Sequence, residues 1–393
     1  MPRMRSVFPI VSLLMLSLLI AGNFVLSDEV GFSGLVGLGV TFTPIPPLAY
    51  NLESGLTLSL NITGFSFGSE TVFDLTGFQS QRFDASVDFG AISLSEEILF
   101  DPSFSWNQVS VDAQIVGVLI GMDLILADIG SVQTPTYSMG SVLELASEVL
   151  DGFAIRSITG FGATDMVNLL GGAEAPFSYE YLYLFSHLDA LFHLQTPPQV
   201  VIVPGFYFEE ELLRLTIDYC GAMASSSTWL SWTGFDKEIL ELGYRFEEPR
   251  IALLTAVAFN SSFAISGLDF LFDLEISDVR FTSKTSFAEP TTPSIIPIVF
   301  SGQGFAVSFT LFDVVFTSET SFDGAFLFAE ERLGIELTVD PVKFASLTAF
   351  DWMGFSGQWI RASVSFSGIS LYTEGKFNYT GVVSVTFGFE FRF

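Results

Sequence analysis

Apolar and polar residues alternate one by one over long stretches of this chain, which is the pattern of β-strands with one dry and one wet face. From Val30 to Phe42 most apolar side chains fall on one parity, and Gly, Ser and Thr occupy most of the other. Comparable alternation recurs at 56–62, 109–115, 179–185, 213–219, 240–246, 268–276, 305–311, 333–339, 360–366 and 385–393. The pattern predicts a protein built of many strands.

A degenerate ten-residue repeat accompanies the alternation. Its copies share apolar second and fourth positions, a polar centre and a closing Phe, and they are Gly64–Phe73, Ala91–Phe100, Asp278–Phe287, Asp313–Phe322 and Gly368–Phe377. Duplicated β-hairpins explain the repeat most simply, with the polar centre as a wet turn or strand end. Without such a turn, the centre would put polar side chains on the same face as the Phe residues. The irregular spacing of the copies argues against a stacked solenoid.

One region departs from the strand pattern. Ser141 and Glu144 form a capping box, the apolar residues from Val142 to Leu150 have helical spacing, and Gly152 is a suitable helix stop. A second, weaker helix is expected from about His187 to Leu194. Together these signals predict a partly helical insertion at about 141–194.

The first residues have the layout of a secretory signal peptide. Arg3 and Arg5 precede an apolar stretch from Val7 to Ala21, and the small residues Gly22 and Ser27 offer cleavage points before residue 28. We therefore expect a signal peptide at 1–27 and a single domain at 28–393. Beyond the signal, no apolar run approaches the ~20 residues of a membrane-spanning helix.

Composition narrows the choice of fold. The chain is 49% hydrophobic and contains 44 Phe. An exported chain this apolar, without a helical span, must bury its apolar surface in a large core or expose it to lipid as a closed barrel, because lipid requires every backbone group to be paired. The single Cys220 excludes an internal disulfide.

Charge restricts the partners. Without Arg3 and Arg5 the chain keeps 13 Lys and Arg against 44 Asp and Glu, a net charge of about −31. Nucleic acid and anionic lipid surfaces are therefore poor partners, and cations are favourable ones.

The last nine residues, from Val385 to Phe393, alternate without a slip and end on an aromatic side chain. This segment resembles the closing strand of bacterial outer-membrane β-barrels, which typically ends in Phe. The resemblance implies an antiparallel transmembrane β-barrel in the cell outer membrane, with membrane lipid and the barrel assembly machinery as partners. It also implies that the assembly signal consists of Phe387, Phe389, Phe391 and Phe393.

Strands of ~9–11 residues plus turns give roughly 16–20 strands for such a barrel. The alternative is a large secreted or cell-surface β-sandwich or irregular β-protein. Alternation alone leaves both open, because each has one wet and one dry face.

Charged residues on the strands point to a wet lumen. They fall on the parity opposite the apolar face, and the candidates for lumen-facing positions are Asp112, Glu241, Arg245, Asp269, Asp273, Glu336, Glu390 and Arg392. A net negative lumen favours cations. The expected function is a porin-like channel for passive diffusion of small solutes or cations, with a homo-oligomer allowed. The alternative is a structural or interaction protein of the cell envelope or surface without transport activity.

Signals for catalysis are weak, and no enzyme is expected. The segment Gly64–Gly68 fits G-x-S-x-G, but that motif needs a sharp strand-to-helix turn, and Ser66 lies inside alternating sequence. The only histidines, His187 and His193, lack the i, i+4 spacing of a helical zinc site. The sequence thus predicts no catalytic, cofactor or metal site.

Overall fold

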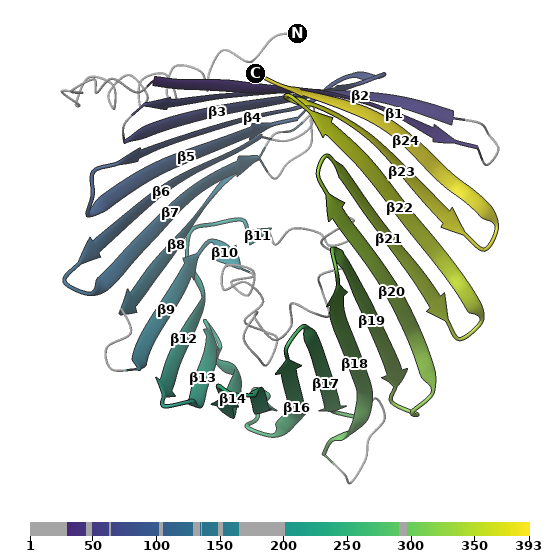
Figure 1. The fold of residues 1–393 in the computed structure, drawn as a ribbon. Helices are drawn as coiled ribbons and strands as arrows, with labels where there is room; N and C mark the ends of the chain where they lie inside the picture. Colours follow the sequence, from purple (N-terminus) through teal and green to yellow (C-terminus); the bar gives the residue numbers. More distant parts are fainter. Residues whose placement is uncertain are drawn as a thin grey trace.

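The chain forms one closed ring of strands (Figure 1). The computed structural model describes residues 30–44, 49–62, 64–101, 105–128, 134, 136–147, 152–164, 201–290 and 297–393. The signal peptide expected at 1–27, the strand expected at 179–185, the helix expected at 187–194 and both histidines lie outside the described residues.

The wall is a 22-stranded sheet in which each strand pairs antiparallel with its neighbours, and β1 pairs with β24. Its first part contains β1 (Val30–Thr43), β2 (Ala49–Ile62), β3 (Phe65–Asp74), β4 (Gly77–Asp88), β5 (Ile92–Phe100), β6 (Ser105–Ile115), β7 (Val118–Asp128), β8 (Tyr137–Ser147) and β9 (Phe153–Phe161). Next come β12 (Phe208–Tyr219), β13 (Ala222–Ser231), β14 (Gly234–Phe246), β15 (Arg250–Phe259), β16 (Ile265–Ile276), β17 (Val279–Ala288) and β18 (Val299–Leu311). The wall ends with β19 (Val314–Asp323), β20 (Phe328–Val339), β21 (Val342–Asp351), β22 (Gly354–Phe366), β23 (Ile369–Asn378) and β24 (Gly381–Arg392).

The predicted antiparallel barrel is confirmed, and its 22 strands exceed the expected number. The reason is the short connections at one end of the barrel. Two-residue turns such as Val116–Gly117, Cys220–Gly221 and Ser367–Gly368 have positive φ at both residues, as in type I′ hairpins, and they use little chain. We call this end, where β24 ends and β1 begins, the terminus rim, and the opposite end the loop rim.

The helix predicted from Ser141 is wrong, because residues up to Ser147 belong to β8. This segment also alternates, and its backbone pairs on both sides, with β7 and with β9. Two full hydrogen-bonded ladders outweigh a local capping signal worth about 1 kcal/mol. No described residue is helical, and among the described residues no helix is long and apolar enough to span a membrane.

The turn or strand end expected at the polar centre of the ten-residue repeat is also wrong. Each copy is the end of a turn followed by one uninterrupted strand, namely β3, β5, β17, β19 or β23. The polar centre therefore stands in the middle of a strand and shares a face with the Phe residues.

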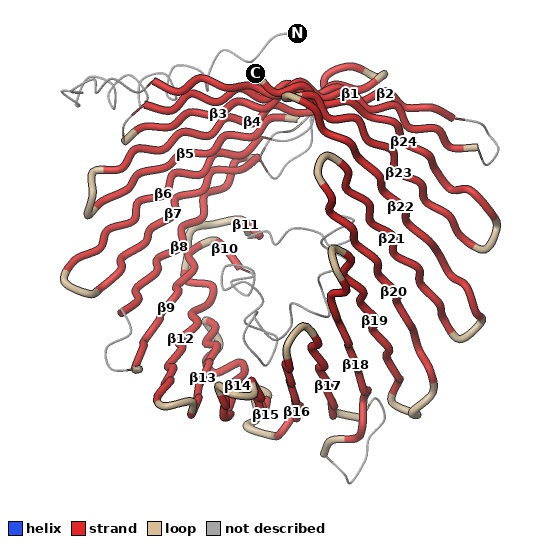
Figure 2. The backbone as a smooth tube through the Cα atoms, in the orientation of Figure 1, coloured by secondary structure: helices blue, strands red, loops and turns tan. Residues whose placement is uncertain are grey.

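A small two-stranded sheet, β10 (Ala163–Thr164) and β11 (Val201–Ile202), lies inside the ring and identifies the lumen face (Figure 1; Figure 2). Val142 and Ile158 of the wall pack against Ala163 and Ile202. Residues that are register partners on neighbouring strands share a face, so the lumen-facing residues can be followed from strand to strand around the barrel. Side chains of the opposite parity point outward, and many are large, apolar and exposed, as in Leu242, Leu253 and Phe366.

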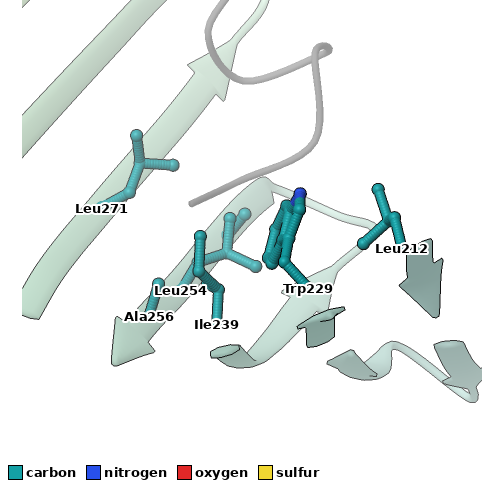
Figure 3. Close-up of a cluster of buried hydrophobic side chains, with 7 residues drawn as sticks. Leu212, Trp229, Ile239, Leu254, Ala256 and Leu271 are labelled. Carbon is teal, nitrogen blue, oxygen red and sulfur yellow. The ribbon is translucent and has the colours of Figure 1, made fainter. Parts of the chain in front are cut away.

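The lumen face is not polar everywhere. Over β12–β16 it carries a buried apolar patch (Figure 3), made of Leu212, Trp229, Ile239, Ala252, Leu254, Ala256 and Leu271. Lys237 lies 4.6 Å from the centre of the Trp229 ring. The alternation did not predict this patch, because these strands are apolar on both faces here.

The ring closes between β1 and β24. Val36, Leu38 and Val40 stand opposite Phe391, Phe389 and Phe387, all on the outer face. Beyond β24, Gly34 N donates to Phe393 O at 2.9 Å, and Phe393 N donates to Gly34 O at 3.0 Å. The Phe393 ring occupies the space that a Cβ at Gly34 would need, so glycine permits the final contact.

Candidate functional site

The lumen wall gathers the basic residues of the barrel. Every Lys and Arg of the described residues lies on the lumen parity of its strand, as the register shows for Arg82, Arg156, Arg214, Lys237, Arg245, Arg250, Arg280, Lys284, Arg332, Lys343, Arg361, Lys376 and Arg392. Acidic side chains stand among them. The wall can therefore hold water and ions, while the outer wall excludes them.

Asp273 is the most buried of the candidate residues. Its carboxylate accepts from Arg280 Nε at 2.8 Å and from Arg280 Nη2 at 3.3 Å, and from the Thr282 hydroxyl at 2.8 Å. Asp273 and Thr282 are both fully buried. A bidentate pair in this position fixes β16 against β17 more than it offers a free charge to a solute.

Two further candidate acids also face bases. Asp269 Oδ2 lies 3.7 Å from Lys284 Nζ. Glu241 accepts from the Ser225 hydroxyl and lies 3.4 Å from Arg214 Nη2. Arg245 lies on the same face of β14, four residues nearer the terminus rim.

Asp112 lies in an acidic part of the wall. It stands opposite Gly121, where a Cβ would lie 2.9 Å from Asp112 Oδ1 and 3.4 Å from Glu144 Cβ. Asp123 accepts from Gln108 at 3.1 Å on the same face, and Arg156 Nε lies 2.7 Å from Glu144. Glycine at 121 leaves room for these carboxylates to approach one another.

The other three candidates line one hollow of about 400 Å³ on the lumen wall near the terminus rim. Glu336 comes from β20, and Glu390 and Arg392 come from β24, 4.0 Å apart. The hollow also receives Lys343, Arg361 and Tyr372. The Arg361 guanidinium lies 5.3 Å from the centre of the Tyr372 ring, which places a cation over an aromatic face.

Sequence reasoning missed two of the three bases of this hollow, Lys343 and Arg361. Both share the parity of the polar face, so the rule that identified the acids would also have found them. Tyr372 gave no signal, because only the fold brings it against Gly388 and Gly39 across the closing seam.

The segment Gly64–Gly68 does not form the strand-to-helix turn that the G-x-S-x-G motif needs. Ser66 lies within β3, and its hydroxyl is 2.7 Å from that of Ser86 on β4. Among the described residues no group of three or more His, Cys, Asp or Glu could hold a metal ion.

Comparison with known proteins gives relatives in fold only. No protein-family model matches the chain, and no curated protein matches it. A mutant of the Rh. blastica porin aligns with a TM-score of 0.37 and 8% identity over 93% of this chain and 100% of the porin. The siderophore receptor PirA from Acinetobacter baumannii aligns with a TM-score of 0.52 and 8% identity over 94% of this chain and 81% of the receptor.

The fold and the two faces of the wall define the class. A closed antiparallel barrel without edges, apolar outside and charged inside, satisfies its backbone in lipid and keeps water in its lumen. The chain is an outer-membrane β-barrel, and its place is the outer membrane.

Proposed function

We propose that this barrel passes small solutes by diffusion through its lumen and that it prefers cations. The observation that carries the proposal is the charge of the lumen wall. Acids outnumber the bases on this face, and they include Glu53, Glu70, Asp84, Glu97, Asp112, Asp123, Glu144, Asp218, Glu241, Asp269, Asp273, Glu275, Glu319, Glu330, Glu336, Glu374 and Glu390. A water-filled path lined by excess carboxylates concentrates cations.

Ion pairing weakens this field locally without cancelling it. Asp269, Asp273 and Glu241 each face a base, so their charges are compensated at short range. The stretch around Asp112 and Asp123 is the acidic part of the wall and supports the cation preference most. We place the selectivity first at Asp112, which belongs to this acidic part, and Glu336 of the hollow is the second lumen acid to be tested.

We expect cation selectivity in planar bilayers under a KCl gradient, with the dilute side becoming positive at zero current. Raising salt should weaken this potential, because the Debye length falls from ~10 Å at 0.1 M to ~3 Å at 1 M. Replacing Asp112 by Asn and Glu336 by Gln should move the potential toward zero.

The matched control is Glu331→Gln, which removes the same charge from the same strand as Glu336 but on the outer face. Its potential should stay at the native value. Anion selectivity of the native protein would overturn the proposal. A folded barrel without conductance would instead favour the alternative, a structural envelope protein.

A further inference from the structure

A polar module recurs on the outer face of the barrel. Ser and Thr stand two residues apart on one strand, and a Gln or Glu of the next strand stands opposite the Thr. The pairs Thr71 and Gln81, Thr159 and Glu211, Thr228 and Glu238, Thr285 and Gln303, Thr320 and Glu331, and Thr348 and Gln358 repeat this arrangement around the wall. We call the set of these outward Ser, Thr, Gln and Glu side chains the collar.

Members of the collar bind one another. The Ser226 hydroxyl donates to Glu238 at 3.0 Å, and the Ser157 hydroxyl donates to Glu211 at 3.1 Å. In a module that has Gln in place of Glu, Gln303 Nε2 donates to the Ser283 hydroxyl at 2.9 Å. A carboxylate accepts up to about four hydrogen bonds. One serine hydroxyl supplies only one of them, so the carboxylates of the collar can also accept hydrogen bonds from groups outside the protein.

On the loop-rim side of the collar stands a ring of Phe side chains. A β-bulge follows the modules at Thr71, Thr285, Thr320 and Thr348 and adds the residue that turns a second Phe outward. The resulting ring pairs include Phe73 with Phe78 at 6.0 Å, Phe287 with Phe300 at 6.0 Å, and Phe350 with Phe355 at 6.2 Å between centroids.

On the terminus-rim side the outer wall is almost wholly apolar. On β20 the outward residues below Glu331 are Leu333, Ile335, Leu337 and Val339. From Glu331 to Val339 the strand advances by eight residues. In a strand tilted by about 40°, this distance corresponds to about 20 Å along the barrel axis. The apolar wall between the terminus rim and the collar therefore provides most of the height of about 25 Å that the apolar band of an outer-membrane barrel has.

The charge of the collar has one sign. Glu211, Glu238 and Glu331 point outward within their strands, while the Lys and Arg of the described residues all lie on the lumen face. Carboxylates without a base beside them are costly in hydrocarbon. Because the collar recurs around the wall, its partner must surround the barrel, which a protein bound to one side does not do.

We propose that the collar marks the level at which hydrocarbon gives way to headgroups on the loop-rim side, and that it binds lipid headgroups carrying an ammonium group. Ammonium donors match the outward carboxylates and amides, whereas phosphate-rich anionic headgroups are repelled. The Phe ring and the exposed loop-tip residues Trp232 and Trp352 then lie in the headgroup layer, where aromatic side chains are favoured. This inference depends on the barrel class and not on conduction.

The first test measures the depth of the collar. In a Cys220→Ser background, Thr348→Cys and Phe344→Cys carry an environment-sensitive nitrobenzoxadiazole label on the same outward face of β21. We expect red-shifted emission at 348 and blue-shifted emission at 344, with acyl-chain quenchers acting on 344 only. Thr320→Cys and Phe316→Cys on β19 form a second pair if the first folds poorly. Equal emission and equal quenching at both depths would overturn the proposal.

The second test measures the headgroup. Folding yield is compared in vesicles containing phosphatidylethanolamine or phosphatidylglycerol in phosphatidylcholine, at low and high salt. We expect a preference for phosphatidylethanolamine that falls at least twofold in the variant Glu211→Gln, Glu238→Gln, Glu331→Gln. The control Glu210→Gln, Glu241→Gln, Glu336→Gln removes the same charges from the lumen face of the same strands and should keep the preference. An unchanged preference in the outer variant would refute headgroup binding.

Discussion

Deleting Phe393 is expected to remove most of the folded barrel from the outer membrane. The deletion takes away two backbone hydrogen bonds between Phe393 and Gly34 and the ring that covers this glycine. The two bonds alone are worth about 2 kcal/mol, a factor of about 30 in the ratio of closed to open barrel. An open seam leaves the edges of β1 and β24 unpaired, which lipid does not tolerate.

Phe393→Ser separates the ring from the backbone. If the aromatic side chain is the assembly signal, both variants should lose membrane yield, and both should gain periplasmic degradation products. The quantity to measure is the heat-modifiable band in outer-membrane fractions.

The matched control for this experiment is Phe366→Ser, an outward Phe at the same rim on β22 that is exposed to a similar degree. Its yield should stay near the native level. Normal yield from the chain without Phe393 would count against both the signal and the seam argument.

Replacing Asp273 by Ala should cost about 3 kcal/mol of unfolding free energy, the lower end of the range for breaking a buried ion pair. The carboxylate is fully buried and holds Arg280 through two nitrogens and Thr282 through its hydroxyl. Without it, the Arg280 guanidinium and the Thr282 hydroxyl lose an acceptor in a place that water hardly reaches. Urea titration of the barrel in lipid vesicles, followed by tryptophan fluorescence, measures the loss.

Glu275→Ala is the control for Asp273→Ala. Glu275 lies two residues further along β16 on the same face and pairs with Arg250 at 3.1 Å, but both side chains are about one third exposed. Exposed pairs contribute at most about 1 kcal/mol. Equal losses in the two variants would mean that burial does not govern the strength of these lumen pairs.

The outer wall explains an unusual composition. Phe supplies the aromatic surface at the loop rim, whereas Tyr and Trp usually combine an apolar ring with a polar group at a membrane interface. Here the two properties sit on separate residues, since Phe350 lies two positions beyond Thr348 on the same face of β21. The ten-residue repeat shows the same separation, with polar residues at its centre and a Phe at its end.

The sequence by itself determined the strands and the face to which each side chain belongs. Successive side chains of a strand point to opposite sides, so alternation assigns Asp112 and Val111 to different faces before any partner is known. The apolar parity, the absence of an apolar run of helical length and the terminal Phe then favour a barrel, because lipid accepts no open sheet, but a β-sandwich stays open until the strands are seen to close. The alternating segments predicted at 213–219, 333–339 and 360–366 are parts of β12, β20 and β22.

Only the tertiary structure decided what depends on pairing between distant residues. Residues from Ser141 to Ser147 carry a helix signal and a strand signal at once, and the ladders to β7 and β9 resolve the conflict. The polar centre of the repeat could have been a turn until the register placed Thr285 opposite Gln303 in mid-strand. Strand number, the closure at Gly34 and Phe393, and the partner of each lumen acid likewise follow from contacts that no local pattern contains, because they join residues far apart in the chain.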